Sequence, residues 1–448
     1  MPKSKLSPVF VPEAEQPYKI PHNWRWVRLG GITDIVGGGT PSTKEKAYYD
    51  NGDIPWISPA DLSGYADIYI AHGAKSITRL GLEKSSAQLL PAETVCLSTR
   101  APIGYVAIAK NPLSTNQGFK SFLPSPSYLP RYLYWYLKGN KDLLESRASG
   151  TTFLELSGRK AANIEFPLPP LAEQQRIVER IESLFTKLDA AREKAQAVVD
   201  GFELRKAAIL YRAFSGKLTA PWRKRLGLKK SDWRKKLIGE FSFVTKLAGF
   251  EYTKNIAPNL SDDGIPLFKG KNVRQGTLVM EFESYIPKEI SDELPRSKLT
   301  RKCLLVPYVG TIGNVAIFDG SFEAHLGSNV GKVEVNSDTF EEYLLYYLQS
   351  GFGYQELTKR KKATAQESIS IQAIRDVIVL LPTWEEQREI VRILDRILER
   401  EQETNDIAEA TITQIDAMKK AILGRAFRGE LGTNDPSEAS PEFAVTVR

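Results

Sequence analysis

The sequence is poor in the residues that reactive and metal-binding sites most often use. It has two cysteines and three histidines in 448 residues, and Cys96 and Cys303 both lie in apolar, strand-like runs. Two cysteines exclude a disulfide scaffold, so we expect buried free thiols in a reducing, cytoplasmic environment. No histidine is paired with another at helical spacing or lies near a cysteine pair, so no zinc site is indicated.

Long apolar runs and nucleotide-binding motifs are also missing. No run approaches the roughly 18 apolar residues of a membrane span, and the polar, proline-rich start does not resemble a signal peptide. GSNVGK at 327–332 has the wrong spacing for a phosphate-binding loop, and the glycines at 37–39 indicate a flexible turn. The Asn/Asp-Pro-Pro-aromatic motif of amino-methyltransferases is absent. These absences favour a binding protein over a catalyst, and we expect no metal and no cofactor in this chain.

Positive charge is concentrated in one segment. The chain has 61 Lys and Arg against 54 Asp and Glu, a net of +7. Residues 217–236 hold nine Lys and Arg against one Asp, a local net of +8, so the rest of the chain sums to −1. Any DNA binding must therefore depend on local surfaces rather than on overall charge. The basic segment either follows phosphates or lies in solvent, and we favour solvent.

The chain repeats itself over most of its length. AILYRAFSGKLT at 208–219 returns as AILGRAFRGELG at 421–432, 213 residues later. Other matched pairs are IGYVAI (103–108) with IGNVAI (312–317), YLYWYL (132–137) with YLLYYL (343–348), and EQQRIV (173–178) with EQREIV (386–391). Such a separation indicates the tandem duplication of a module of about 210 residues, too long for a solenoid repeat.

Each module is predicted to have an α+β front and a helical back. The fronts mix short β-branched or aromatic runs with turn residues, whereas the backs are almost free of proline and glycine. The predicted parts are an N-terminal arm (1–20), a first front (21–168), a long helix (169–216), a basic linker (217–231), a second front (232–381), a second long helix (382–430) and a disordered tail (431–448).

Both long helices carry an apolar stripe with heptad spacing. A helix of this length cannot bury its stripe alone, so we expect the two to pack as an antiparallel coiled coil with pseudo-twofold symmetry. Arg205 interrupts the first stripe, and Glu401, Thr404 and Thr411 interrupt the second. The predicted seam residues are Ile177, Ile181, Leu184, Leu188, Val198, Phe202, Ile390, Leu394, Ile397, Ile415, Met418 and Ile422.

Polar, glycine-punctuated loops at matching places in both fronts are the candidate binding surfaces. Arg pairs with guanine edges and Asn or Gln with adenine edges, while Lys and Ser mostly hold phosphates. The alternative is that these loops are hairpin turns with solvated side chains. The candidate DNA-binding residues are Thr40, Ser42, Lys44, Ser98, Arg100, Asn116, Gln117, Lys120, Lys269, Lys271, Asn272, Tyr308, Thr311, Asn314, Asn329, Arg360 and Lys361.

The two sets of loops differ at their tips. Arg100 lies on one loop, and Tyr308 and Thr311 lie on its counterpart; by word alignment, Gln117 is replaced by Val330. Two modules with one framework and different tips predict two different target sequences.

These motifs together resemble the specificity subunits of type I restriction–modification systems, over roughly residues 20–432. The resemblance is carried by WRWVRLGGITDIVGGGTPST, LSTRAPIGYVAI, FPLPPLAEQQRIV and AILYRAFSGKLT, with WEEQREIV and AILGRAFRGEL in the second copy. It implies two target-recognition domains that read the halves of a bipartite, asymmetric site in double-stranded DNA.

The resemblance also implies partners. The helices would space the domains and dock two modification subunits, which would carry S-adenosylmethionine and methylate adenine. Restriction subunits would add ATP- and Mg-dependent translocation and cleavage. The alternative class is a protein–protein scaffold with two α+β modules on a coiled-coil rod. A complete methyltransferase is disfavoured by the missing cofactor motifs.

Overall fold

The computed structural model describes residues 9–100, 102–149, 154–336, 338–359 and 367–442. The chain forms two compact units, the first from residues 1–194 and 410–448 and the second from 195–409. Each unit therefore contains one α+β front and a stretch of both long helices, and the α+β class predicted from the sequence is confirmed. No helix in the described part of the chain is both long enough and apolar enough to cross a bilayer.

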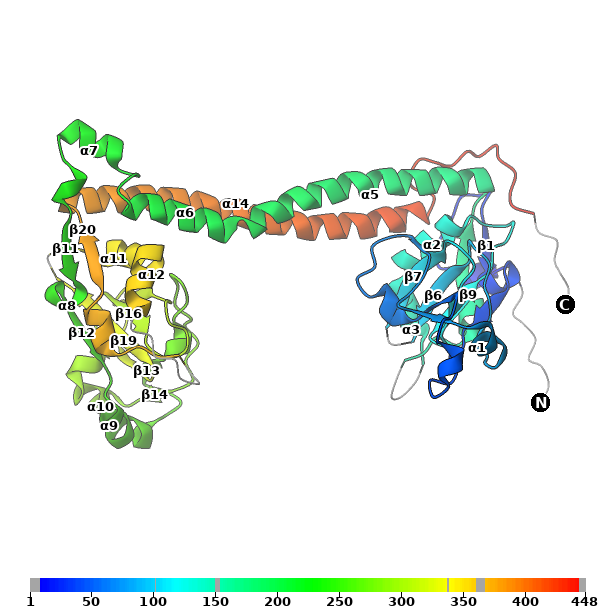
Figure 1. Ribbon diagram of the computed structural model, residues 1–448. Helices are drawn as coiled ribbons and strands as arrows, with labels where there is room; N and C mark the ends of the chain where they lie inside the picture. The colour runs from blue at the N-terminus through cyan, green and yellow to red at the C-terminus, as the bar shows by residue number, and fades with distance from the viewer. Residues whose placement is uncertain (1–8, 101, 150–153, 337, 360–366, 443–448) are drawn as a thin grey trace. The chain divides into compact units, whose positions relative to one another are not determined.

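Unit 1 holds its strands in three small sheets (Figure 1). The largest, ordered β2-β9-β6-β7-β4, is β2 (Ile35–Gly37), β9 (Phe119–Phe122), β6 (Val95–Thr99), β7 (Ile103–Ala109) and β4 (Tyr69–Ile70). The second is β5 (Lys75–Ile77), β3 (Ile54–Ile57) and β8 (Ser114–Thr115), and β1 (Arg25–Arg28) pairs with β10 (Glu165–Leu168). Its short helices are α1 (Arg79–Glu83), α2 (Pro130–Gly139), α3 (Lys141–Arg147) and α4 (Gly158–Ala162).

Unit 2 repeats this plan. One sheet is β12 (Ser242–Lys246), β19 (Val330–Val335), β16 (Cys303–Pro307) and β17 (Ala316–Phe318). The others are β14 (Tyr285–Ile286), β13 (Ile265–Phe268), β18 (Ala324–Leu326) and β15 (Lys298–Leu299), and the pair β11 (Arg234–Leu237) with β20 (Ile378–Leu381). Its short helices are α7 (Ala220–Leu226), α8 (Ile238–Phe241), α9 (Gly249–Glu251), α10 (Lys288–Asp292), α11 (Glu341–Gln349), α12 (Gly351–Thr358) and α13 (Ile371–Arg375).

The long helices are α5 (Leu171–Asp200), α6 (Phe202–Phe214) and α14 (Trp384–Ala426). The sequence predicts one helix over 169–216, and the structure divides it at Gly201, the glycine in its interior. The division is slight, because the Gly201 amide still donates to the Ala197 carbonyl at 3.2 Å. The missing side chain at this position weakens helical preference locally.

The repeated sequence motifs at the ends of the long helices pack on the α+β front of the other repeat. Phe427, at the end of the second helix, contacts Tyr132 and Tyr136 of α2 at 5.3 and 5.1 Å between ring centres. Phe214, at the end of the first helix, contacts the equivalent tyrosines of α11 in unit 2 at 5.5 and 5.2 Å. Each unit thus completes its apolar core with the helix end of the other repeat.

The repeated Glu-Gln pair fixes the start of each long helix to its own front. Glu173 accepts a hydrogen bond from the Trp24 indole at 2.8 Å, and Glu386 accepts one from the Trp233 indole at 3.0 Å. Gln174 donates to the Pro169 carbonyl at 3.0 Å, in the same way that Gln387 donates to Pro382 at 3.1 Å. Because the four side chains are buried, these bonds set the angle at which each helix leaves its domain.

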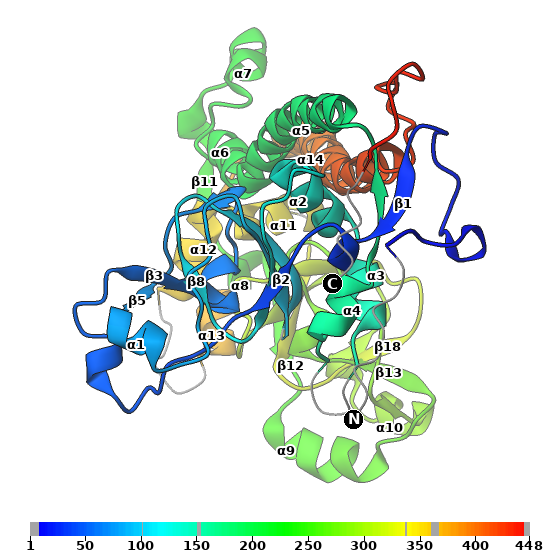
Figure 2. The same ribbon diagram turned by 90° about the vertical axis from the view of Figure 1, so that its right-hand side faces the viewer.

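Antiparallel packing of the long helices is confirmed within each unit. In unit 1, Asp189 pairs with Lys419 and Arg192 pairs with Asp416. Residue numbers therefore increase along one helix as they decrease along the other, so the two helices are antiparallel. The first turns of α5 and the end of α14 lie side by side in both views (Figure 1; Figure 2).

Most of the predicted seam residues are shielded from solvent. The buried seam residues are Ile177, Ile181, Ile390, Leu394 and Ile415, and the half-buried ones are Leu184, Leu188, Val198, Phe202, Ile397 and Ile422.

Met418 is a wrong prediction, because its side chain is 45% exposed. The next residue takes the inward place: the Lys419 ammonium lies 5.0 Å from the centre of the Phe185 ring and pairs with Asp189. The heptad pattern places the inward position after Ile415 three residues on, at Met418, whereas in the structure it lies four residues on, at Lys419.

Two interruptions of the seam pair with each other. In unit 2 the Arg205 guanidinium lies 2.7 Å from the Glu401 carboxylate. Each residue breaks the apolar stripe of its own helix, but together they form one ion pair between the helices.

The segments after the helices are more ordered than the sequence predicts. The prediction of a disordered tail from residue 431 is wrong for residues 431–442, because Arg176 forms a two-bond ion pair with Glu438 at 2.8 and 2.9 Å. Asn434 also donates to Glu173 at 2.8 Å. Acidic and amide side chains of the tail thus bind Arg176 and Glu173 on α5.

The basic linker is mostly exposed, as expected, but Arg223 is not. The residue is 6% exposed, and its guanidinium pairs with Glu386, which also accepts from the Thr219 hydroxyl at 2.6 Å. The Arg223 guanidinium also lies 5.5 Å from the centre of the Trp233 ring. The expectation that this segment lies in solvent is therefore wrong for the inner face of α7.

Candidate nucleic-acid interface

In unit 1 the candidate loops meet where β2, β6 and β9 leave the main sheet. Leu97 pairs with Lys120 and Ser98 with Phe119, so the loop after β6 lies beside the turn before β9. The Gly39 amide donates to the Thr115 carbonyl at 2.9 Å, which brings the loop after β2 to the same place. The Thr40 hydroxyl donates to the Gln117 side-chain carbonyl across these loops.

Most of the candidate residues of unit 1 are accessible there. Ser42, Lys44, Arg100 and Gln117 are exposed, and Thr40, Asn116 and Lys120 are half-buried.

Ser98 is a wrong prediction, since its side chain is fully buried. Its hydroxyl donates to the Pro102 carbonyl at 2.8 Å and accepts from the Tyr105 amide at 2.8 Å. The β6–β7 pairing is irregular between Leu97 and Thr99, and Ser98 supplies the hydrogen bonds that the loop backbone lacks.

Unit 2 brings the matching loops to the same end of its sheet. The Tyr308 amide donates to the Asn329 carbonyl at 3.1 Å, and the Gly270 amide donates to Ser328 at 3.0 Å. Asn329 adopts a left-handed conformation (φ 66°), which asparagine tolerates better than most residues. Its side chain is exposed at the turn.

The remaining candidates of unit 2 divide into accessible and occupied residues. Thr311 is exposed, while Tyr308 and Asn314 are half-buried. Lys269 and Lys271 both face Glu283, so part of their charge is already neutralised. Arg360 and Lys361 lie outside the described residues.

Asn272 is a second wrong prediction, with 2% of its surface exposed. Its amide donates to the carbonyls of Val279 and Glu281, both at 3.0 Å, and its oxygen accepts from the Lys269 amide at 3.0 Å. Both donor hydrogens of the side-chain amide and its oxygen therefore serve the loop.

Lys246 is a half-buried basic residue at this end of unit 2 that the sequence analysis did not identify. It is the last residue of β12, and its ammonium lies 4.7 Å from the centre of the Tyr308 ring. The sequence offers a weak indication, because the strand runs directly into a polar loop. Burial raises the pKa of the Tyr308 hydroxyl, so the ring stays neutral beside the ammonium.

The strand register corrects one correspondence between the two repeats that alignment of the sequence motifs had given. Thr115 faces Ile57 in unit 1, and Leu326 faces Phe268, the equivalent of Ile57, in unit 2. The counterpart of Gln117 is therefore Ser328 rather than Val330. On the neighbouring loop, the counterpart of Arg100 is Val309, because Cys96 faces Ala107 as Leu305 faces Ala316.

The described residues do not assemble a reactive set at this interface. Burial raises the pKa of the Cys96 and Cys303 thiols to about 12, so neither provides a thiolate near neutral pH, and both are free and buried, as the sequence predicts. No three His, Cys, Asp or Glu residues in the described ranges come together in a way that could hold a metal ion.

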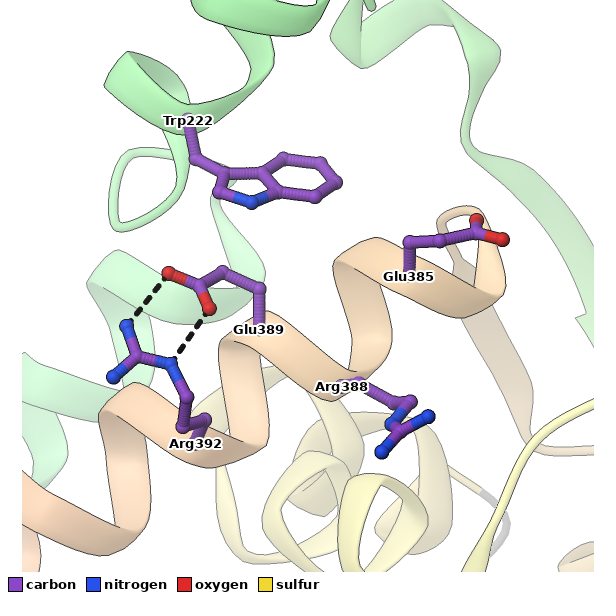
Figure 3. A pocket seen from close by; sticks show the side chains of 5 residues that line it. All are labelled: Trp222, Glu385, Arg388, Glu389 and Arg392. Atoms are coloured by element: carbon purple, nitrogen blue, oxygen red, sulfur yellow. Dashed lines mark hydrogen bonds and ion pairs between the residues drawn. The ribbon is translucent and has the colours of Figure 1, made fainter.

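A separate cavity of about 350 Å³ lies between α7 and the first turns of α14. Figure 3 shows the Trp222 indole from α7 above the ion pair of Glu389 and Arg392 on α14. The Arg392 hydrogen bond lowers the pKa of Glu389, so this carboxylate is a poor proton acceptor. Glu385 and Arg388 complete the lining, which has no nucleophile. The cavity is not a candidate active site.

Comparison with known proteins identifies a family. The profile of the "Type I restriction modification DNA specificity domain" family matches residues 21–198 and 230–415. The MjaIX specificity subunit of Methanocaldococcus jannaschii is 41% identical over 188 residues, 42% of this chain and 43% of that protein. This chain thus spans less than half the length of that relative in the match.

Two further relatives match over most of their length. The EcoKI specificity subunit of Escherichia coli K12 is 23% identical over 434 residues, 92% of this chain and 90% of that protein. The crystal structure of the HsdS subunit from Thermoanaerobacter tengcongensis covers 93% of this chain and 100% of its own, with a TM-score of 0.62 and 21% identity. At that identity the structural likeness shows a shared fold.

Proposed function

Because the chain belongs to the type I restriction-modification DNA specificity family, we propose that it selects the DNA sequence on which a type I restriction–modification complex acts. Each unit reads one half of a bipartite, asymmetric site in double-stranded DNA. The DNA lies against the sheet ends where the polar loops meet.

One observation carries this proposal: matched places in the two units present different side chains on the same framework. Arg100 in unit 1 corresponds to Val309 in unit 2, and Gln117 corresponds to Ser328, by strand register. Two modules that read unlike half-sites require a shared backbone framework with different side chains on the loops that face DNA.

The exposed side chains suit base edges in the major groove. Arg100 can donate two parallel hydrogen bonds to guanine, and Asn329 can pair with adenine. Gln117 is held by the Thr40 hydroxyl, which limits its rotation and so improves its discrimination. The half-buried Tyr308 offers an aromatic face and a hydroxyl at the equivalent end of unit 2.

The chemistry belongs to partner subunits in this proposal, and this chain is non-catalytic. Two modification subunits that carry S-adenosylmethionine dock on the long helices and methylate adenine. Restriction subunits supply ATP- and Mg-dependent cleavage. The lack of a reactive set among the described residues supports this division of labour.

Arg100→Ala tests the base-reading role. We expect the variant, assembled with its modification subunit, to methylate a motif that is relaxed at one position in one half, at a discrimination cost of about 1–3 kcal/mol. Modified-base sequencing of host DNA measures the motif. Arg25→Ala, an exposed arginine on β1, is the matched control and should leave the motif unchanged. Equal relaxation in both halves would refute the assignment.

A further inference from the structure

A lysine faces a glycine at the same cross-strand position in both units, but on exchanged strands. In unit 1, Gly37 of β2 pairs with Lys120 of β9. In unit 2, Lys246 of β12 pairs with Gly331 of β19. The strands involved are the edge strand and its neighbour in each main sheet.

The register shows that these are the same two positions. Lys120 pairs with Leu97 on its other side, as Gly331 pairs with Val306, the equivalent of Leu97. Lys120 and Gly331 are therefore counterparts, and so are Gly37 and Lys246. Each unit keeps one lysine at this corner of the sheet and takes it from a different strand.

The surroundings changed together with the lysine. A side chain at Gly37 would begin 3.8 Å from the Lys120 ammonium, and one at Gly158 would begin 3.7 Å from the same side chain. In unit 2 the counterpart of Gly158 is Ile371, whose terminal methyl group lies 3.0 Å from where a side chain at Gly331 would begin. The space that the Lys120 stem uses in unit 1 is thus occupied by Ile371 in unit 2.

Neither lysine has a carboxylate partner within the described ranges. By contrast, the neighbouring Lys332 is 3% exposed and lies 2.9 Å from Glu334, and Lys271 pairs with Glu283. The Lys120 ammonium donates to the Phe119 carbonyl at 3.5 Å, and the Lys246 ammonium faces the Tyr308 ring. Neither contact neutralises the positive charge, so a lysine charge kept at this position in both units points to an anion from outside the chain.

We propose that Lys120 and Lys246 are equivalent anchors for DNA phosphate, one in each unit; this rests on the proposed function. The two units differ at their loop tips, so a group that both retain is suited to the part of DNA that both half-sites share, which is the backbone. A lysine ammonium is a point charge and suits a phosphate oxygen without reading a base.

The first experiment measures affinity against salt for the full chain assembled with its modification subunits. Lys120→Gln and Lys246→Gln should each weaken binding to target and to unrelated duplex DNA by the same factor. Each should lower the slope of log K against log salt by about 0.9. Between 50 and 200 mM salt, each variant should then lose about threefold less affinity than the parent. The methylated motif should stay the same.

The second experiment moves the lysine between strands. Lys120→Gly should lose one phosphate contact, and Gly37→Lys combined with Lys120→Gly should regain it, because it copies the arrangement of unit 2. The exchange is made in unit 1 because a side chain at Gly37 would have room there. The atom nearest to it is the Lys120 ammonium, which Lys120→Gly removes. Thermal unfolding of each variant confirms that it is folded.

Three results would overturn the proposal. A motif altered in one half would mean that the lysine reads a base. An unchanged salt slope in the Gln variants would mean that the lysine is structural. A folded double variant that fails to regain affinity would mean that the two positions are not equivalent. Failure of the parent complex to bind DNA would instead refute the proposed function, so the two failures are distinguishable.

Discussion

Glu173 and Glu386 both connect the start of a long helix to the front that precedes it, but their other partners differ. Both are buried at the start of a long helix and accept a hydrogen bond from a repeated tryptophan. Glu173 otherwise meets the neutral amide of Asn434, whereas Glu386 meets the buried guanidinium of Arg223. Burial raises the pKa of Glu173, in keeping with its neutral donors.

This difference predicts unequal costs of removal. Glu386→Ala strands a buried guanidinium and should lower the free energy of unfolding of unit 2 by about 3–5 kcal/mol. Glu173→Ala leaves only neutral donors unpaired and should cost unit 1 about 1–3 kcal/mol. Urea unfolding followed by hydrogen exchange in each unit measures both values. Equal losses would contradict the assigned role of Arg223.

His325 gives unit 2 a pH dependence that unit 1 does not share at the equivalent position. Its side chain is fully buried, and burial lowers its pKa from 6.5. The folded protein keeps the imidazole neutral while the unfolded chain takes up a proton. Stability from this residue is therefore present above about pH 6.5 and is lost as the pH falls below it.

The test replaces His325 with the serine that unit 1 carries at Ser114. His325→Ser should flatten the dependence of the unfolding free energy on pH between 7.5 and 5.5, by at most about 1.4 kcal/mol per pH unit. His72→Ser, at an exposed histidine, is the matched control. A slope in the His325 variant equal to that of the parent would disprove this role.

At the scale of elements, the exchange of helix ends explains why the words AILYRAF and AILGRAF are repeated. Phe214 and Phe427 are both buried against an aromatic strip of the other repeat. The hydroxyl groups of Tyr132 and Tyr343 on those strips donate to equivalent carbonyls, at 2.9 and 2.6 Å. A module could not complete its core with its own helix alone.

Phe427→Ala should therefore loosen the first front rather than the second. Truncating a buried phenylalanine costs about 3–5 kcal/mol. We expect faster hydrogen exchange in α2 and no change in α11, and the matched variant Phe214→Ala should show the reverse. Faster exchange in α11 of the Phe427 variant would show that each helix end serves its own repeat.

At the scale of the whole molecule, the sequence predicts the two α+β fronts and the long helices but not how they share partners. Arg205 and Glu401 each break a seam, and nothing in either helix alone shows that they pair. The tail is polar and proline-containing, which predicts disorder, yet Arg176 on a distant helix binds Glu438. Such contacts depend on residues far apart in the chain.

The candidate interface was predictable as a set of loops and not as a set of side chains. Ser98 and Asn272 are short polar residues beside turns, and such residues satisfy loop backbone as readily as they face a ligand. Lys246 was missed because only strand register places it opposite Gly331. Word alignment also paired Gln117 with the wrong residue.

In the proposed function, two units with different loop tips read two different half-sites. Modified-base sequencing of DNA from cells that express this chain with its modification subunit tests it most directly. We expect methylated adenines in a motif of two unlike halves separated by an unread gap of fixed length. An assembled complex that leaves no motif, or one continuous motif without a gap, would contradict it.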